Sequence, residues 1–133
     1  MMVGKKIISG RIIYNGIAEG ECLFTTEPLL FYTGIDVTSG KIIEHSHPLK
    51  NKSVKNKILI LPWAKGSTVG SYTILQLAKN GVGPLGIINE SCEPIVAVGV
   101  IISKIPCVDQ VDIQLLKNAN RVRIEGEKIF IQE

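Results

Sequence analysis

The central part of the chain carries the pattern that decides the fold, and it reads KILILP at residues 57–62, WAKG at 63–66 and STVGSYTILQLAK at 67–79. A short aliphatic run that ends at a proline is typical of a buried strand. Between Ser67 and Lys79 the apolar residues recur at helical spacing, and Asn80-Gly81 follows as a helix stop. The sequence therefore predicts a strand, a glycine-containing turn and a helix in direct succession.

Further strands are predicted on both sides of this unit. Residues 7–14 and 17–24 surround Asn15-Gly16, where we expect a hairpin turn with positive φ at both turn positions. Residues 121–125 and 128–132 surround Gly126-Glu127 in the same way. Single strands are expected at 41–44, 85–89 and 95–102. Many strands around one clear helix indicate an α+β (mixed β/α) fold, formed by a single domain over residues 1–133.

The composition is that of a folded domain with an aliphatic core, because 45% of the residues are hydrophobic and only 5% are aromatic. Fifteen basic and twelve acidic residues leave a net charge of +3, whereas a nucleic-acid-binding surface is usually more basic and carries stacking aromatics. The one dense basic segment, residues 50–57, is interpreted as a solvated loop. A surface for an acidic partner subunit is the alternative. No nucleic-acid partner is expected.

The cysteines and the apolar segments indicate the cellular compartment in which the protein is expected. Cys22, Cys92 and Cys107 are widely spaced and form no CxxC pair, so neither a zinc site nor a disulfide framework is indicated. We expect buried thiols and a reducing, cytoplasmic setting. Residues 1–6 lack the apolar stretch of a signal peptide. No apolar run approaches the roughly 20 residues that span a bilayer, so no membrane partner is expected.

The predicted helix start at Ser67 is where ligand chemistry is expected. The first N–H groups of a helix have no partner within the helix, and the helix dipole makes this end electropositive. Gly66 would let a ligand approach the backbone closely, so this turn could bind carboxylate or phosphate oxygens. The alternative is that Ser67 or Thr68 only caps the helix. The pattern is neither a P-loop nor a GxSxG nucleophile elbow.

Four segments, in this order, carry a resemblance to one family: Tyr32–Asp36, His47-Pro48-Leu49, Lys57–Pro62 and Gly66–Ser71. Together with their spacing over residues 10–106, they resemble the aconitase X swivel domain. The resemblance implies a swivelling β/β/α fold that is similar to the mobile last domain of aconitase. It also implies a hydro-lyase subunit. In many archaea this domain is a separate small polypeptide of an enzyme that dehydrates (R)-5-phosphomevalonate in the mevalonate route to isoprenoids, whereas bacterial relatives act on cis-3-hydroxy-L-proline.

The resemblance also implies roles for individual residues. Ser67 would be the catalytic base that accepts the α proton of a phosphorylated hydroxy acid, and Gly66 and Thr68 would complete an anion-binding turn. Lys65 would add positive charge beside the serine. Ordinary aconitases follow the serine with an arginine that grips a carboxylate. Val69 stands in that place here, so other groups must bind the carboxylate.

The resemblance further implies a heterodimer in which a large subunit carries an iron–sulfur cluster, expected to be of the 4Fe–4S type. The three cysteines of this chain do not have the spacing of cluster ligands. We therefore expect that this chain binds no metal by itself and is inactive without its large subunit.

Several residues allow two interpretations each. Gly34 and Asp36 could line the substrate site, or Asp36 could only form an Asx-type turn with Thr38. His45 and His47 could share a strand face and bind metal, but ordinary surface histidines are the simpler interpretation. A swivelling phosphocarrier that uses one of these histidines, or a plain anion-binding module, remains the alternative function. Residues 90–93 could face the same cleft or form a turn. The loop 25–40 could close on substrate or dock the partner, and its apolar island, residues 29–32, could pack against the body of the protein or against a partner.

Overall fold

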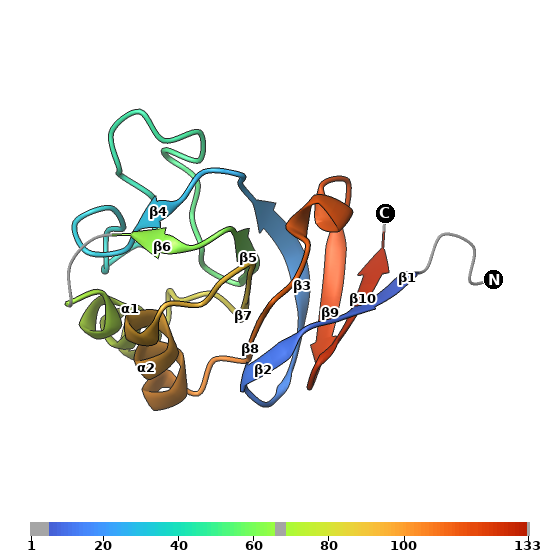
Figure 1. Cartoon of the computed structure of the whole chain (residues 1–133). Helices are drawn as coiled ribbons and strands as arrows, with labels where there is room; N and C mark the ends of the chain where they lie inside the picture. Colours follow the sequence, from blue (N-terminus) through green and yellow to red (C-terminus); the bar gives the residue numbers. More distant parts are fainter. Residues whose placement is uncertain (1–5, 66–68, 133) are drawn as a thin grey trace.

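The computed structural model describes residues 6–65 and 69–132. Within these ranges six strands come first, and two α-helices and one 3-10 helix are then interspersed among the remaining strands (Figure 1). The helices are α1 (Gly70–Lys79), α2 (Pro94–Ser103) and the 3-10 helix η1 (Ile113–Leu116). The strands are β1 (Lys6–Ser9), β2 (Arg11–Tyr14), β3 (Ile17–Phe24), β4 (Leu29–Leu30), β5 (Lys57–Leu61), β6 (Ala64–Lys65), β7 (Gly86–Asn89), β8 (Cys107–Asp109), β9 (Arg121–Glu125) and β10 (Lys128–Gln132).

Eight strands form one mixed sheet in the order β1-β10-β9-β3-β5-β7-β8-β2, and β4 and β6 form a separate parallel pair. The neighbours β3, β5, β7 and β8 are parallel, and the other neighbours are antiparallel. The strand–turn–helix unit predicted from residues 57–79 lies at the centre as β5, β6 and α1. This arrangement confirms the expected mixture of strands and helices in an α+β fold.

The two edges of the large sheet are consecutive in the sequence. β1 pairs with β10 and β2 pairs with β8, and only Gly10 separates the two strands. A Cβ on Gly10 would lie 2.4 Å from the carbonyl oxygen of Asp109, so the chain can pass at this point only without a side chain. One bent segment therefore supplies both edge strands of the sheet.

This bend makes the predicted N-terminal hairpin wrong. β2 pairs with β8, while β3 pairs with β5 and β9, so the strands before and after Asn15-Gly16 are not partners. Neither Asn15 nor Gly16 has a positive φ, as a two-residue hairpin turn would require. Gly16 instead allows a close approach to Pro106, whose Cγ would lie 2.8 Å from an added Cβ. The C-terminal hairpin is confirmed as β9 and β10, with Gly126 at φ +59°.

The apolar run at 95–102 forms helix α2 and not the predicted strand. Pro94 occupies the first helical turn, where its fixed φ is favourable, and Lys104 ends the helix in the left-handed conformation. A continuous apolar run has no periodicity that separates a strand from a helix, so the helix could not be recognised from this pattern. The strand predicted at 41–44 is reduced to isolated bridges, Ile35 with Ile42 and Lys41 with Ser53.

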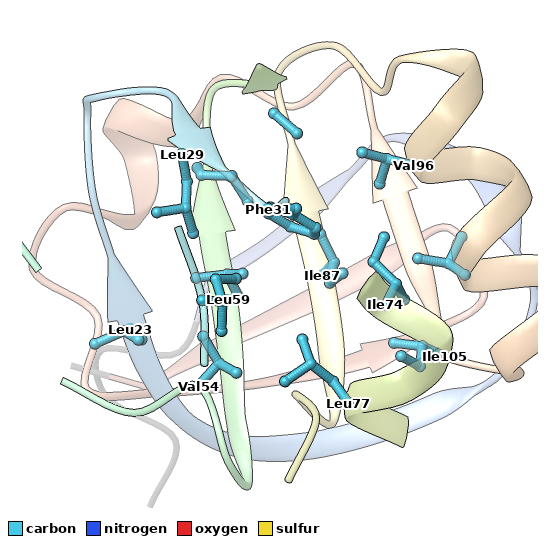
Figure 2. Packing of buried hydrophobic residues seen from close by; sticks show 14 of the residues in the cluster. Leu23, Leu29, Phe31, Val54, Leu59, Ile74, Leu77, Ile87, Val96 and Ile105 are labelled. Atoms are coloured by element: carbon cyan, nitrogen blue, oxygen red, sulfur yellow. The ribbon is translucent and has the colours of Figure 1, made fainter. Parts of the chain in front are cut away.

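Alternate residues of the central strands enter two separate cores. Leu59 and Leu61 of β5 join the cluster beneath the helices, whereas Ile58 and Ile60 join the cluster on the opposite face. Figure 2 shows Leu59 and Ile87 of the sheet beside Ile74 and Leu77 of α1. Period-two alternation of this kind follows from strand geometry. Helices α1 and α2 pack side by side over one face only (Figure 1).

The long connection between β3 and β5 is ordered by packing. Leu29 and Phe31 are buried in the helix-side core, whereas Tyr32 is 46% exposed. The predicted apolar island therefore packs mainly against the body of the protein. Lys50, Lys52 and Lys55 are exposed on this connection, as expected of a solvated loop.

Candidate functional site

The predicted base and its two neighbours, Gly66, Ser67 and Thr68, lie outside the described residues. The structure describes the elements on both sides of them, β6 and α1. Helix α1 begins at Gly70, and its N-cap is Val69, which makes no side-chain capping bond. The described helix therefore begins later than the predicted start at Ser67, whereas the alternative that Ser67 or Thr68 caps it falls on residues outside the described ranges. Gly70 is buried against Ile95 of α2, where an added Cβ would lie 3.4 Å away, and this packing sets the first turn.

Lys65 ends strand β6, immediately before the undescribed turn. Its ammonium Nζ lies 2.8 Å from Oε2 of Glu44, and the Lys65 side chain is 49% exposed. The other carboxylate oxygen of Glu44 accepts a hydrogen bond of 2.8 Å from the Leu30 backbone N–H. Since Leu30 pairs with Lys65 in the β4–β6 ladder, one carboxylate secures both strands of this small sheet. The charge that was expected to lie beside the serine is therefore partly neutralised by a carboxylate.

A shallow depression of about 30 Å³ lies between β6 and the helix starts. Seven described residues line it: Phe31, Ala64, Lys65, Gly70, Glu93, Ile95 and Val96. Binding pockets for metabolite-sized ligands usually measure several hundred Å³, so the described residues supply at most one wall of such a pocket. A larger hollow of about 260 Å³ involves β3, β9 and β10 and shares no residue with the depression. Its charged residues include the ion pair Arg123–Glu125, at 2.7 Å.

Gly34 is surrounded by backbone on both sides. A Cβ at Gly34 would lie 1.9 Å from the carbonyl oxygen of Leu30. The carbonyl oxygen of Gly34 accepts hydrogen bonds from the backbone N–H groups of Ile43 (2.8 Å) and Glu44 (3.1 Å). Gly34 therefore holds the loop that carries Glu44, and no other residue fits there without a backbone shift.

Asp36 forms the Asx-type turn that was one of its two interpretations. Its Oδ1 accepts hydrogen bonds from the backbone N–H (3.0 Å) and the hydroxyl (2.8 Å) of Thr38, and its Oδ2 accepts one from the Ser39 hydroxyl (3.1 Å). These bonds, the one from the Thr38 backbone first, hold the pKa of Asp36 below its usual value. The carboxylate is exposed at the surface.

The two histidines have different environments. His45 is exposed, whereas His47 is only 7% exposed. The Leu49 N–H donates to Nδ1 of His47 (3.0 Å), so Nε2 carries the proton and donates to the carbonyl oxygen of Pro28 (3.1 Å). His47 is therefore a buried structural residue, and the prediction of an ordinary surface histidine is wrong for it. Both of its nitrogens are engaged, which leaves neither available to carry a phosphoryl group.

A buried polar cluster near the start of α2 escaped sequence reasoning. The fully buried carboxylate of Asp109 accepts two 2.8 Å bonds from Arg11 and one of 2.9 Å from the Cys92 N–H. Burial alone would raise the pKa of Asp109, but these bonds outweigh it and hold the pKa below its usual value. Cys92 thus belongs to a turn that Asp109 secures, and only Glu93 of the predicted segment 90–93 lines the depression.

The described residues do not fit a resident iron–sulfur cluster. Among residues 6–65 and 69–132, no group of three or more histidine, cysteine, aspartate or glutamate side chains could hold a metal ion. All three cysteines are free thiols; Cys92 and Cys107 belong to the helix-side core, whereas Cys22 packs against the opposite core. Because a cluster is usually held by several thiolates, these residues supply no set of ligands for one.

Comparison with known proteins identifies the family to which this fold belongs. The family model of the aconitase X swivel domain matches residues 7–132. The chain belongs to the aconitase X swivel-domain family. It is 45% identical over 128 residues to the phosphomevalonate dehydratase small subunit of Methanosarcina acetivorans, covering 94% of this chain and 89% of that one. Its identity to the protein of the same name from Pyrococcus furiosus is 46%, with 91% and 90% covered.

A solved structure supports the same assignment of an aconitase X swivel domain. The crystal structure of Thermococcus kodakaraensis aconitase X in its holo-form superimposes with a TM-score of 0.93 at 42% sequence identity, and the match covers 96% of this chain and 99% of that one. The predicted resemblance to this family and the predicted fold are therefore confirmed. Neither α1 nor any other helix among the described residues has the length and hydropathy needed to cross a bilayer.

Proposed function

We propose that this chain is the small subunit of a phosphomevalonate dehydratase, a hydro-lyase that converts (R)-5-phosphomevalonate to trans-anhydromevalonate 5-phosphate and water. The observation that carries the proposal is the similarity to small subunits of that name, at 45–46% identity over more than nine-tenths of this chain. The same fold in an aconitase X holo-structure is consistent with it.

In this proposal Ser67 accepts the α proton of the substrate. A neutral serine is a weak base, so its alkoxide needs a positive local potential. Two described features support such a potential near this turn, namely the start of helix α1 and the ammonium group of Lys65. Gly66 and Thr68 would offer N–H groups to the anionic oxygens of the substrate, which Val69 cannot grip with its side chain.

Gly34 and Asp36 contribute to the proposed site through the loop that they shape. The Gly34 carbonyl holds the backbone of Glu44, whose side chain contacts Lys65, and the Asp36 carboxylate closes its own turn. We therefore propose that Gly34 and Asp36 keep the loop beside β6 in place. We also propose that Lys65 contacts substrate oxygens directly.

The proposed enzyme is a heterodimer, and its large subunit would hold the iron–sulfur cluster. The name "small subunit" of the relatives implies a larger partner. An exposed apolar surface that could bind such a partner lies on α2, where Val98, Ile101 and Ile102 are 49–57% exposed. This surface continues through Ile95 to the depression beside Lys65, so a partner bound here would complete the pocket. The unpaired cysteines agree with a reducing, cytoplasmic location.

The proposal is tested by anaerobic co-expression with the large subunit, followed by assays with phosphomevalonate and with cis-3-hydroxy-L-proline. Turnover of phosphomevalonate alone supports it, and turnover of hydroxyproline alone transfers the chain to another hydro-lyase. Ser67→Ala should lower kcat by about 10²- to 10⁴-fold, as expected on loss of a general base. Ser71→Ala, in the first turn of α1, is the matched control and should stay active. Full activity of Ser67→Ala would overturn the assignment of the base.

The partner surface has its own test. Ile102→Asp should weaken association with the large subunit at least about tenfold, because it places a charge within the apolar surface. Ile17→Asp is the control, since Ile17 on β3 is similarly exposed (67%) but lies away from the helices. Equal affinity of both variants, measured by titration calorimetry, would remove α2 from the interface.

A further inference from the structure

Glu44 connects the segment around β4 with the end of β6, which are distant in the sequence. Its Oε1 accepts the Leu30 N–H of β4, its Oε2 pairs with Nζ of Lys65 at the end of β6, and its own backbone N–H donates to the Gly34 carbonyl. The Glu44 side chain is 13% exposed. A buried carboxylate needs partners for both oxygens, and this one has a partner for each.

The Glu44–Lys65 pair differs from two of the other ion pairs of the described residues. In Lys57–Glu21 the acid is 62% exposed and in Arg123–Glu125 it is 38% exposed, so both pairs are solvated on the acidic side. Arg11–Asp109 also joins a buried acid to an exposed cation, but neither residue lines the depression beside Lys65. In Lys65–Glu44 the side chain of the acid is only 13% exposed, while the Lys65 side chain remains half exposed at the rim of the depression. An ammonium group has three N–H donors, and Glu44 Oε2 occupies one direction only. The arrangement is that of a fixed anion that orients a cation toward a ligand.

The pKa of Glu44 agrees with this geometry. Burial acts to raise the pKa, but the hydrogen bond from Lys65, the Leu30 N–H and the charge of Lys65 together hold it below its usual value. The carboxylate therefore stays ionised at neutral pH and keeps its hold on Lys65.

We propose that Glu44 is a positioning residue that fixes the Lys65 ammonium at the rim of the site, where it binds an anionic oxygen of the substrate. The proposal rests on the proposed function, and it adds a residue whose role is to act through Lys65. Without Glu44, the long lysine side chain would sample many rotamers and its ammonium would meet the substrate less often.

The test compares Glu44→Gln, Lys65→Met and the double variant in the complete two-subunit enzyme. Glutamine keeps an oxygen for the Leu30 N–H and removes only the charge that holds Lys65. Glu44→Gln should raise KM for phosphomevalonate about tenfold and change kcat much less, as expected for lost ground-state binding. Lys65→Met should raise KM at least as much. In the double variant the Glu44 substitution should have no additional effect, because the group that it positions is already absent.

Glu21→Gln is the matched control, since it removes the acid of the exposed Lys57–Glu21 pair; its KM should equal that of the wild type. A KM of Glu44→Gln equal to the wild-type value would overturn the inference, and so would a Glu44 effect that persists in full in the Lys65→Met background. Circular dichroism and subunit association of each variant would show whether a KM change reflects unfolding.

The wild-type pair separates the two proposals. If the wild-type pair neither turns over nor binds phosphomevalonate, the proposed function fails and this inference falls with it. If the wild-type pair is active and Glu44→Gln binds phosphomevalonate with unchanged Kd by calorimetry, only the inference fails.

Discussion

The core opposite the helices and the connection between β3 and β5 are stabilised by different kinds of interaction. The core opposite the helices consists of fully or almost fully buried aliphatic side chains, most of them from regular strands, such as Ile60, Ile124 and Ile129. The connection between β3 and β5, which carries Glu44, is built from turns and from hydrogen bonds between side chains and backbone. Most of the described residues with a positive φ lie in this connection: Thr33, Gly40, Ser46, Asn51 and Asn56.

This difference suggests how the protein divides stability and function. Regular strands pair their own backbone N–H and C=O groups. The stability lost on a substitution in these strands is therefore set by the packing of its side chain. The connection depends on single groups that secure irregular backbone, and such backbone is commonly found where ligands bind. We expect apolar truncations to unfold the first region, and small polar or steric changes in the second to affect the site before the fold.

The largest expected effect on stability is in the sheet core. Ile60→Ala should lower the free energy of unfolding by about 2–5 kcal/mol, because it removes a fully buried side chain from the central strand β5. Ile43→Ala, on the connection and 46% exposed, is the matched truncation and should change it by about 0.5 kcal/mol or less. Urea unfolding measures both. Equal costs would contradict the division between the two regions.

A smaller effect is expected at Gly34. Gly34→Ala should cost about 1–3 kcal/mol and lower the activity of the complex, because the new methyl group would overlap the Leu30 carbonyl oxygen. Gly83→Ala is the control, since the nearest atoms to its added Cβ lie at 3.4–3.6 Å, an ordinary contact. Thermal unfolding and turnover would be measured on both. A Gly34→Ala protein with the stability of Gly83→Ala would show that the close approach is not rigid.

Asp109, in the buried polar cluster near the start of α2, makes the stability of the fold depend on pH. Its pKa is lower in the folded state than in the unfolded state, so the folded protein binds fewer protons and the stabilisation is complete above the unfolded pKa of about 4. It is lost as pH falls below that value. Asp109→Asn should lower the free energy of unfolding by about 1–3 kcal/mol at pH 7 and by less at pH 3, because a buried charged hydrogen-bond acceptor is lost. A difference that is equal at both pH values would contradict the role of the charge.

The smallest effect is expected at Asp36. Asp36→Asn keeps an oxygen for the Thr38 N–H, so the turn should persist with unchanged KM and kcat. A clear increase in KM would instead show that the carboxylate contacts the substrate directly. Steady-state kinetics of the two-subunit enzyme distinguish the outcomes.

Several parts of the fold and the site could be predicted because they depend on local chemistry. The aliphatic run Lys57–Leu61 predicts a buried strand, and Gly126 predicts the C-terminal hairpin, because each pattern restricts its own backbone. The same is true of the Asx turn at Asp36, which is one of the two interpretations of that segment. The role of Ser67 comes from family resemblance and remains a prediction.

What only the tertiary structure decided involves residues that meet across long stretches of chain. Asn15-Gly16 resembles a hairpin turn, yet the bend at Gly10 assigns β2 to β8 and β3 to β9. The apolar run of α2 is equally compatible with a strand until its packing against α1 is known. No local pattern pairs Glu44 with Lys65, because a salt bridge depends on distance in space and not in sequence. Local steric preferences restrict each segment, whereas the choice among the remaining conformations requires the contacts of the folded chain.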